Sequence, residues 1–387
     1  MTAQAATLNP LSHTSEEFVA LARPLGVRTP AALAAYRACF RDGARAAGPA
    51  RVEVPEIGTQ VREDSPEGTV IKFTQRVPGV GASPGAESGN NTARPAFADL
   101  STESVLIPMI SSRGERSYTL CVSSQIGCAM GCTFCETAQM GLIRSLSPAE
   151  IVGQWYAATH VLGVRPKNIV FMGMGEPLDN LTSVLRAIAV LKDHNGPHVP
   201  VSQITVSTSG RVDGIRTLAE HVRQPGWHRL GLALSLNAPN DTDRSAIMPL
   251  NRRWPLASLQ EALLAWPQRS GNKVCIEYVL IPGVNDSPVH AQQIAEFFRP
   301  FGLLAAGRIA GQPIMAVLNL IPYNPRRNSP WPAPTEDAVD AFLQSLIDLG
   351  VFAKRRRTKG RTMMGACGQL GSEAIRKRRP VDLTISA

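Results

Sequence analysis

The sequence predicts an α/β protein whose main domain is a partial (β/α)6 barrel, preceded by a small N-terminal accessory domain. From residue 101 onward, short β-branched apolar runs alternate with longer amphipathic stretches, which is typical of repeated βα units around a parallel sheet. Six such runs suggest a sheet that forms only part of a barrel. Active-site groups of such barrels lie at the carboxyl ends of the strands, so polar residues there are candidates for function.

The elements of the main domain can be placed from these runs. The six core strands are expected at residues 118–122, 168–172, 203–207, 230–236, 273–280 and 314–321. A helix is expected over 147–163, because Ser147 can cap it, Pro148 suits its first turn, and Glu150 can complete a capping box. The main domain is expected to span 101–372, with a basic tail at 373–387.

The first 100 residues are expected to form the accessory domain. Apolar residues recur at helical spacing in the first 50 residues, which predicts short helices. Residues 70–73 are expected to form a strand. Residues 78–95 consist largely of Gly, Ser, Asn and Pro with little to bury, which predicts a flexible insert before the main domain.

Charge and cysteine content indicate the kind of partner and the compartment. The 40 Lys and Arg residues exceed the 31 Asp and Glu residues by nine, which favours a polyanionic partner. The chain has no signal-like opening, and no apolar run approaches the roughly 18 residues of a membrane span, so we expect a cytoplasmic protein without a membrane partner. Seven cysteines, an odd number, favour metal or redox chemistry over a disulfide framework.

Three of the cysteines, Cys128, Cys132 and Cys135, form a C-x-x-x-C-x-x-C motif directly after the first core strand. Three thiolates can bind three irons of a 4Fe-4S cubane, and the fourth iron then stays open for the amino and carboxylate groups of S-adenosylmethionine (SAM). The alternative is a zinc site with Cys121 as the fourth thiolate. The single cysteine triplet and the polar ends of the downstream strands favour the cluster.

Polar residues follow several of the expected strands. In the loop at 173–177, glycines allow a ligand to approach the backbone, and the Glu176 carboxylate can accept a hydrogen bond from the SAM ammonium. The further candidates at strand ends are Gly175, Ser207, Ser235, Leu236, Asn237 and Asn319. Each of them alone is equally compatible with an ordinary turn or cap.

Seven segments, in this order, resemble the RlmN/Cfr family of class A radical SAM methyltransferases, which act on RNA adenosines. The segments are Glu103-Ser-Val-Leu-Ile-Pro, Cys121-Val-Ser-Ser-Gln-Ile-Gly-Cys128, Gly173-Met-Gly-Glu-Pro, Ser207-Thr-Ser-Gly, Ser235-Leu-Asn, Asn319-Leu-Ile-Pro and Ala366-Cys367-Gly-Gln-Leu. They run from Glu103 to Leu370. The chain departs from the family at Asn237, where His is usual.

The resemblance implies a fold, a set of cofactors and a role for each motif. The fold is a radical SAM barrel, and SAM is bound by the strand-end residues named above. Cys367 is the implied methyl carrier, Cys121 the resolving thiol that closes a disulfide with it, and Glu103 the proton acceptor. The implied partners are RNA, ribosomal or transfer, and an electron donor such as flavodoxin or ferredoxin, and we expect a monomer.

Carbon 2 of adenine is the favoured target, and carbon 8 of an adenosine in ribosomal RNA, the Cfr-type outcome, is the alternative within the family. A non-catalytic, zinc-stabilised RNA-binding protein and a radical SAM enzyme of small molecules are the alternatives from other classes. Basic residues flank Cys367 and suit RNA phosphates. They are Lys354, Arg355, Arg356, Arg357, Lys359, Arg361, Arg376, Lys377, Arg378 and Arg379. Tyr323 and Trp254 are candidates for base stacking, whereas Cys39 and Cys275 are expected to be packing residues.

Overall fold

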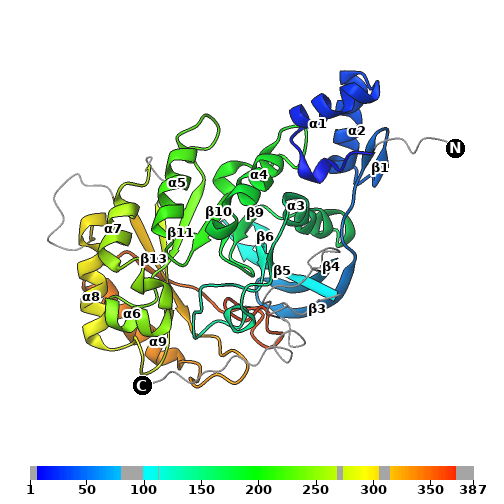
Figure 1. Cartoon of the computed structure of the whole chain (residues 1–387). Helices are drawn as coiled ribbons and strands as arrows, with labels where there is room; N and C mark the ends of the chain where they lie inside the picture. Colours follow the sequence, from blue (N-terminus) through cyan, green and yellow to red (C-terminus); the bar gives the residue numbers. More distant parts are fainter. Residues whose placement is uncertain (1–6, 80–98, 112, 268–272, 305–313, 372–387) are drawn as a thin grey trace, which may run out of the picture.

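A computed structural model describes residues 7–79, 99–111, 113–267, 273–304 and 314–371 of the chain. Nearly all of the insert expected at 78–95 and the whole tail expected at 373–387 lie outside the described residues. Figure 1 shows a curved central sheet with helices on its outer side and a separate group of helices near the N-terminus.

The central sheet has ten strands in the order β14-β13-β12-β11-β10-β9-β6-β5-β4-β3. All neighbours from β6 to β14 pair in parallel. The six predicted core strands are confirmed as β6 (Arg116–Cys121), β9 (Asn168–Phe171), β10 (Ile204–Thr208), β11 (Gly231–Ser235), β12 (Val274–Leu280) and β13 (Ala316–Pro322). A seventh parallel strand, β14 (Ala353–Arg355), was not predicted, since only three residues of a basic stretch form it.

Helices follow the strands in the alternation that the sequence predicted. Their bounds are α3 (Pro148–Tyr156), α4 (Leu181–Lys192), α5 (Val212–Val222), α6 (Asp241–Ile247), α7 (Leu256–Leu264), α8 (Pro288–Phe298) and α9 (Glu336–Asp348). The predicted start of α3 is confirmed, because Ser147 and Glu150 form the capping box and Pro148 is in the first turn. A π-helical segment, Ala157–Val161, continues the helix toward its expected end. The α/β barrel class is thus confirmed.

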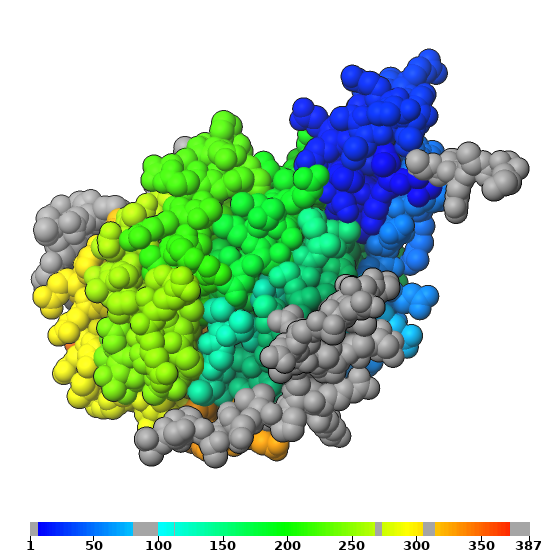
Figure 2. Space-filling model, viewed as in Figure 1, coloured from blue at the N-terminus to red at the C-terminus, as the bar shows by residue number. Residues whose placement is uncertain are grey.

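The N-terminal part contributes both helices and strands. Helices α1 (Ser15–Ala22) and α2 (Thr29–Arg41) pack together and form the lobe that projects from the body in Figure 2. Strands β3 (Ile57–Ser65) and β4 (Gly68–Pro78) form a hairpin that pairs antiparallel with β5 (Asp99–Ile110), and β5 pairs with β6. The sheet therefore continues across the expected boundary at residue 101.

Alternation along the parallel strands separates a core face from an interior face. Ile276 and Leu318 lie side by side in register and are fully buried in the hydrophobic core. Their neighbours Glu277 and Asn319 also lie side by side, and successive residues of a strand point to opposite faces. The interior face of the barrel is consequently polar at the level of Glu277, which prepares it for a ligand.

Candidate active site

A cavity opens at the carboxyl ends of the barrel strands and contains about 970 Å³ of empty space, part of it open to solvent. Its walls come from the loops after β6 and β9 and from the ends of β10, β11, β12 and β13. Barrels of this type carry their active sites at this end, and the size suits a small-molecule ligand. The predicted site residues that line the cavity are Cys128, Cys132, Cys135, Gly175, Glu176, Ser207, Ser235, Asn237 and Cys367.

The cysteine motif lies on a loop between two short paired strands, β7 (Gln125–Ile126) and β8 (Arg144–Ser145). The loop is fixed near its start, because the Cys128 N–H donates to the Gly141 carbonyl at 3.1 Å. Burial raises the pKa of all three thiols of the motif, since removal from water disfavours the thiolate. An iron centre beside them would favour the thiolate instead, as bound cations do.

The arrangement of the donor atoms distinguishes kinds of metal centre. In the described part of the chain, no three His, Cys, Asp or Glu side chains converge where one metal ion would be held. The three thiols line one cavity from separate places along the loop. A 4Fe-4S cubane takes each thiolate on a different iron, so this donor set fits a cluster with one iron left for a further ligand.

The loop after β9 presents Glu176 to the same cavity. The Glu176 carboxylate is only 2% exposed; its Oε2 accepts from the Ser209 N–H and hydroxyl, both at 2.8 Å, and its Oε1 accepts from the Leu178 N–H at 3.1 Å. Burial raises the pKa of Glu176, and the Ser209 contacts act in the opposite direction. Gly175 has φ = +102°, and a Cβ there would lie 2.6 Å from the Gln125 Cβ, so only glycine allows this close approach.

Arg244 of α6 organises the ends of β10 and β11, a role that sequence reasoning missed because arginine usually faces solvent. Its side chain is fully buried and donates to the carbonyls of Ser209 (2.6 Å), Leu236 (2.9 Å) and Ser235 (3.1 Å). Leu236 is itself fully buried and is absent from the described wall of the cavity. The strand ends are therefore held by one charged side chain from outside the sheet.

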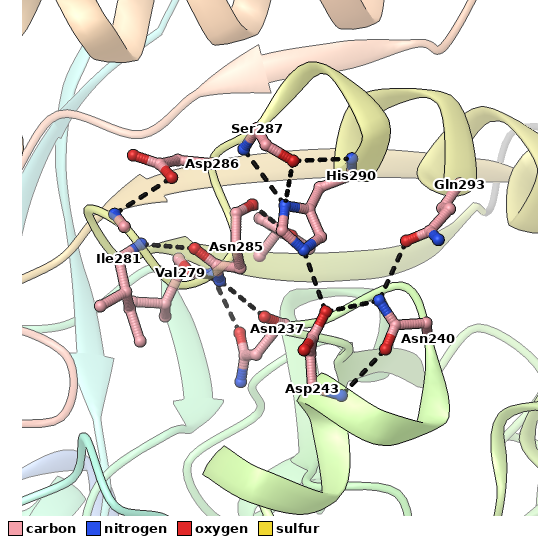
Figure 3. A network of polar contacts seen from close by, with 12 residues as sticks. Asn237, Asn240, Asp243, Val279, Ile281, Asn285, Asp286, Ser287, His290 and Gln293 are labelled. Carbon is pink, nitrogen blue, oxygen red and sulfur yellow. Dashed lines mark hydrogen bonds and ion pairs between the residues drawn. The ribbon is translucent and has the colours of Figure 1, made fainter.

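Asn237 adopts the left-handed backbone conformation (φ = +57°) shortly after β11. Its Oδ1 accepts from the Val279 N–H at 2.9 Å, and its Nδ2 lies 3.4 Å from the Met248 sulfur. Asn285 donates to the carbonyls of both Asn237 and Val279, each at 2.7 Å, in the network that Figure 3 shows. The carboxamide that sequence analysis assigned to SAM is thus engaged in joining β11 to β12.

Asn319 lies beside the cavity rather than in its wall. Its Nδ2 donates to the Glu277 Oε1 at 2.9 Å and contacts the Cys275 sulfur at 2.8 Å, and Glu277 lines the cavity. The prediction that Cys275 is a packing residue is wrong, because this half-buried thiol belongs to the polar group around Glu277. Cys39, by contrast, is fully buried in the hydrophobic core, as predicted. Glu277 was missed, although a carboxylate within an apolar strand was its signal.

Cys121 and Cys367 lie close to each other next to the main cavity. Cys121, at the end of β6, and Cys367 both line two smaller cavities together with Met172 and Arg356. Both thiols are free in this structure. Burial raises the pKa of Cys121, and Arg356 acts in the opposite direction. Cys367 is exposed, but into the cavities, so it is accessible from the interior of the barrel.

Glu103 is placed differently from the other predicted residues. It lies on β5 and is 7% exposed, and its carboxylate forms an ion pair with Lys72 of β4 at 2.9 Å. It is absent from the described walls of the three cavities that contain Cys367. Glu103 is nevertheless near Cys121, because Val105, two residues further along β5, is in register with Cys121.

The basic residues before Cys367 are partly committed to partners within the protein. Arg355 pairs with Glu336 and Asp340, whereas the Arg357 side chain is 79% exposed and lies 3.7 Å from Glu67. The four basic residues at 376–379 lie outside the described residues. Exposed positive charge is therefore present at Lys354 and Arg357, and partly at Arg356, rather than along the whole stretch.

The two candidate stacking residues differ in how they are surrounded. The guanidinium groups of Arg211 and Arg253 lie 5.5 and 4.6 Å from the centre of the Trp254 ring, so these cations already occupy positions over it. Tyr323 is 1% exposed, shares a hydrogen bond with the Ser329 hydroxyl at 2.8 Å, and lines the main cavity. Neither ring stands free on the outer surface.

Comparisons with known proteins agree with this geometry. Residues 122–292 match the family model of the radical SAM superfamily. The structure superposes on a radical SAM methyltransferase from Sphaerobacter thermophilus with a TM-score of 0.76 and 32% identity, over 93% of this chain and 98% of that one. A dual-specificity RNA methyltransferase RlmN of Anaeromyxobacter dehalogenans is 38% identical over 83% of this chain and 81% of its own length.

A probable dual-specificity RNA methyltransferase, RlmN 1 of Protochlamydia amoebophila, is 41% identical over 74% of each chain. The barrel, the cysteine loop and the glycine–glutamate loop thus define a radical SAM enzyme. Within that class, the chain belongs to the RlmN family. The alternative of a non-catalytic, zinc-stabilised RNA-binding protein is wrong. None of the described helices combines the length and apolar character that a membrane span requires.

Proposed function

We propose that this radical SAM RNA methyltransferase methylates carbon 2 of an adenine base in RNA, through a methyl group carried on Cys367. The observation that carries the proposal is the placement of Cys367 in one cavity with the cluster-type cysteines and Glu176, and in two further cavities with Cys121. An aromatic ring carbon offers no lone pair to an ordinary methyl sulfonium, so a methyl carrier and a radical route are needed. Cysteine suits the carrier because it is a good nucleophile.

The residues that would hold the cofactors follow from the cavity walls. Cys128, Cys132 and Cys135 would bind a 4Fe-4S cluster, and Glu176 would accept a hydrogen bond from the SAM ammonium. The further residues assigned to SAM are Gly175, Ser207, Ser235, Leu236, Asn237 and Asn319. When bound and reduced by a donor such as flavodoxin or ferredoxin, the cluster with SAM supplies the 5'-deoxyadenosyl radical that activates the methyl group.

The protein's own residues then complete the reaction. The Cys367 thiolate would take a methyl group from SAM, with S-adenosylhomocysteine as the leaving group. This methyl group would lose one hydrogen atom to the 5'-deoxyadenosyl radical, and the resulting methylene carbon would bond to the base. The radical adduct gives one electron to a one-electron acceptor, such as an oxidised flavodoxin, and Glu103 takes the proton of the substituted carbon. The Cys121 thiolate attacks the Cys367 sulfur; a disulfide forms, and the carbon–sulfur electron pair goes to the methylene carbon, which takes up a proton.

Mass-spectrometric nucleoside analysis tests the proposal. RNA from cells that lack the protein, or that overproduce it or its Cys367→Ala variant, would be digested to nucleosides, with ribosomal and transfer RNA separated beforehand. We expect 2-methyladenosine to rise only with the unchanged protein. A rise in 8-methyladenosine would show that carbon 8 is the target. If neither 2-methyladenosine nor 8-methyladenosine rose, methylation of adenine at these positions would be excluded.

The domain division and oligomeric state are also part of the proposal. We assign residues 1–100 to an accessory domain, 101–372 to the methyltransferase domain and 373–387 to a basic tail. The helical lobe of α1 and α2 supports an accessory unit within the first 100 residues, because it packs outside the sheet, whereas β3 and β4 of this segment extend the central sheet. A monomer is expected, and light scattering of the purified protein would test it.

A further inference from the structure

A buried lysine connects three separate parts of the chain next to the proposed reaction. Lys72 lies on β4 and is 8% exposed. Its Nζ is 2.9 Å from the Glu103 Oε2 on β5, and it donates to the Met364 carbonyl at 2.9 Å. A buried ammonium is costly unless it is paired and hydrogen-bonded, so both contacts are needed to retain it here.

The same carboxylate also binds the other end of the Cys367 loop. The Gly371 N–H donates to the Glu103 Oε2 at 3.0 Å. Met364 precedes Cys367 by three residues and Gly371 follows it by four, so Lys72 and Glu103 together hold this loop on both sides of its cysteine. A loop fixed at both ends carries its reactive sulfur in a defined place, which intramolecular reactions require.

The contacts also orient the carboxylate. Both Lys72 and Gly371 contact Oε2, so two donors fix the orientation of the carboxylate, and Oε1 is the oxygen that the proposed proton transfer would use. Glu103 is on the same face of β5 as Val105, because side chains two residues apart share a face, and Val105 is in register with Cys121. The ion pair therefore lies on the face of the sheet that carries Cys121, and it contacts the loop that carries Cys367 on both sides of that cysteine.

We propose that Lys72 is a positioning residue for release of the methylated base: it pairs with and orients the Glu103 carboxylate, which itself holds the loop of Cys367 through Gly371. This inference rests on the proposed function, specifically on Glu103 as the proton acceptor. Lys72 does not touch the reacting atoms. Its effect acts through Glu103, so removal of its charge slows proton transfer and product release more than it slows methylation of Cys367.

The test uses the full-length enzyme with its reconstituted cluster and compares Lys72→Met, Lys72→Arg, Glu103→Gln and the double variant Lys72→Met/Glu103→Gln. Two steps are measured separately. Methyl transfer to Cys367 is followed by mass spectrometry of its peptide, and the covalent RNA adduct is followed on denaturing gels with labelled RNA. Arg144→Met is the matched control, because it removes another partly buried ion pair, with Glu150, that lies outside the Glu103 contacts.

For Lys72→Met we expect release to slow by about tenfold or more, with trapped adduct, and methylation of Cys367 to stay within about threefold of the unchanged enzyme. Lys72→Arg should recover part of the release rate. In the Glu103→Gln background, Lys72→Met should have no further effect, because residues that act as a unit are non-additive. The double variant leaves no buried charge unpaired, so it can be measured even where Lys72→Met folds poorly.

The role of Lys72 would be overturned if Lys72→Met released the methylated RNA at the normal rate. It would also be overturned if Lys72→Met slowed Cys367 methylation and RNA release equally and Arg144→Met did the same. Further slowing in the Glu103→Gln background would overturn it too, since Lys72 would then act independently of Glu103. Normal release by Glu103→Gln would instead overturn the proton-acceptor role in the proposed function. If Glu103→Gln traps the RNA adduct and Lys72→Met releases RNA normally, the proposed function stands and only the positioning role of Lys72 is excluded.

Discussion

The Glu136 N–H donates to the Gly368 carbonyl at 2.7 Å, which fastens the residue after Cys135 to the residue after Cys367. A second contact follows, from the Thr137 hydroxyl to the Leu370 carbonyl at 2.6 Å, although 233 positions separate these two residues in the chain. The loop of Cys367 is thus docked on the loop of the cluster-type cysteines. This docking brings Cys367 and the cluster-type cysteines to one cavity, as the proposed function requires.

Replacement of any cluster-type cysteine, Cys128→Ala, Cys132→Ala or Cys135→Ala, should abolish reductive cleavage of SAM. Each change removes one thiolate and leaves one iron without its protein ligand. Formation of 5'-deoxyadenosine under reducing conditions measures the effect, together with iron and sulfide content. Cys39→Ala is the control, because that thiol lies in the core away from the cavity. A normal yield of 5'-deoxyadenosine from any of the three variants would remove the cluster assignment.

Replacement of Cys121 and replacement of Cys367 should have opposite effects on the covalent RNA adduct. Cys367→Ala should neither accept a methyl group nor bind RNA covalently, because the carrier sulfur is gone. Cys121→Ala should still be methylated on Cys367 and should accumulate a nuclease-sensitive RNA adduct, because no thiol remains to break the thioether. Denaturing electrophoresis and mass spectrometry of the Cys367 peptide measure both. Full turnover by Cys121→Ala, with no trapped RNA, would contradict the resolving role.

Asn237→His should keep methylation activity within about tenfold, equivalent to about 1.4 kcal/mol. Histidine is among the residues that tolerate a positive φ, and a ring nitrogen can accept the hydrogen bond that the Val279 N–H now gives to Asn237. Asn237→Leu is the contrasting variant. It lacks the acceptor, so a buried N–H loses its partner, and we expect a loss of about 1–3 kcal/mol in the free energy of unfolding. Equal stability of the two variants would show that the Val279 contact is unimportant.

Binding of SAM should weaken on mild acidification, at a pH above the range in which an ordinary glutamate titrates. Burial raises the pKa of Glu176, so its carboxylate becomes protonated earlier as the pH falls and can no longer accept from the SAM ammonium. At a pH below the raised pKa of Glu176, the neutral carboxylic acid is favoured in the folded protein. At a pH above this pKa, the carboxylate is present and can bind SAM. Equilibrium binding of SAM between about pH 8 and about pH 5.5, above the ordinary glutamate range, measures the effect. Glu176→Gln should bind weakly at every pH, and an unchanged pH profile in that variant would assign the titration elsewhere.

Much of this protein can be predicted from its sequence, because the signals are local. The cysteine spacing fits within eight residues, the capping box of α3 spans Ser147 to Glu150, and each parallel strand is a short apolar run. Such patterns depend on neighbouring residues and on the periods of helix and strand, so they are visible without a fold. The cysteine triplet and the strand-end residues of the main cavity were found in this way, whereas Cys367 was assigned only through the resemblance of its segment to the RlmN/Cfr family.

Contacts between segments that are distant in the chain could be identified only from the tertiary structure. The sequence shows Lys72 as one residue of an apolar run, Arg244 as a charge in a helix and Cys275 as a packing thiol, yet their roles depend on partners that the fold brings to them. Gly371 and Glu103 are 268 residues apart, and their hydrogen bond exists only because β5 and the segment after Cys367 meet. Composition and spacing determined the class of chemistry, whereas burial, which makes each unpaired polar group costly, decided which side chains hold the site together.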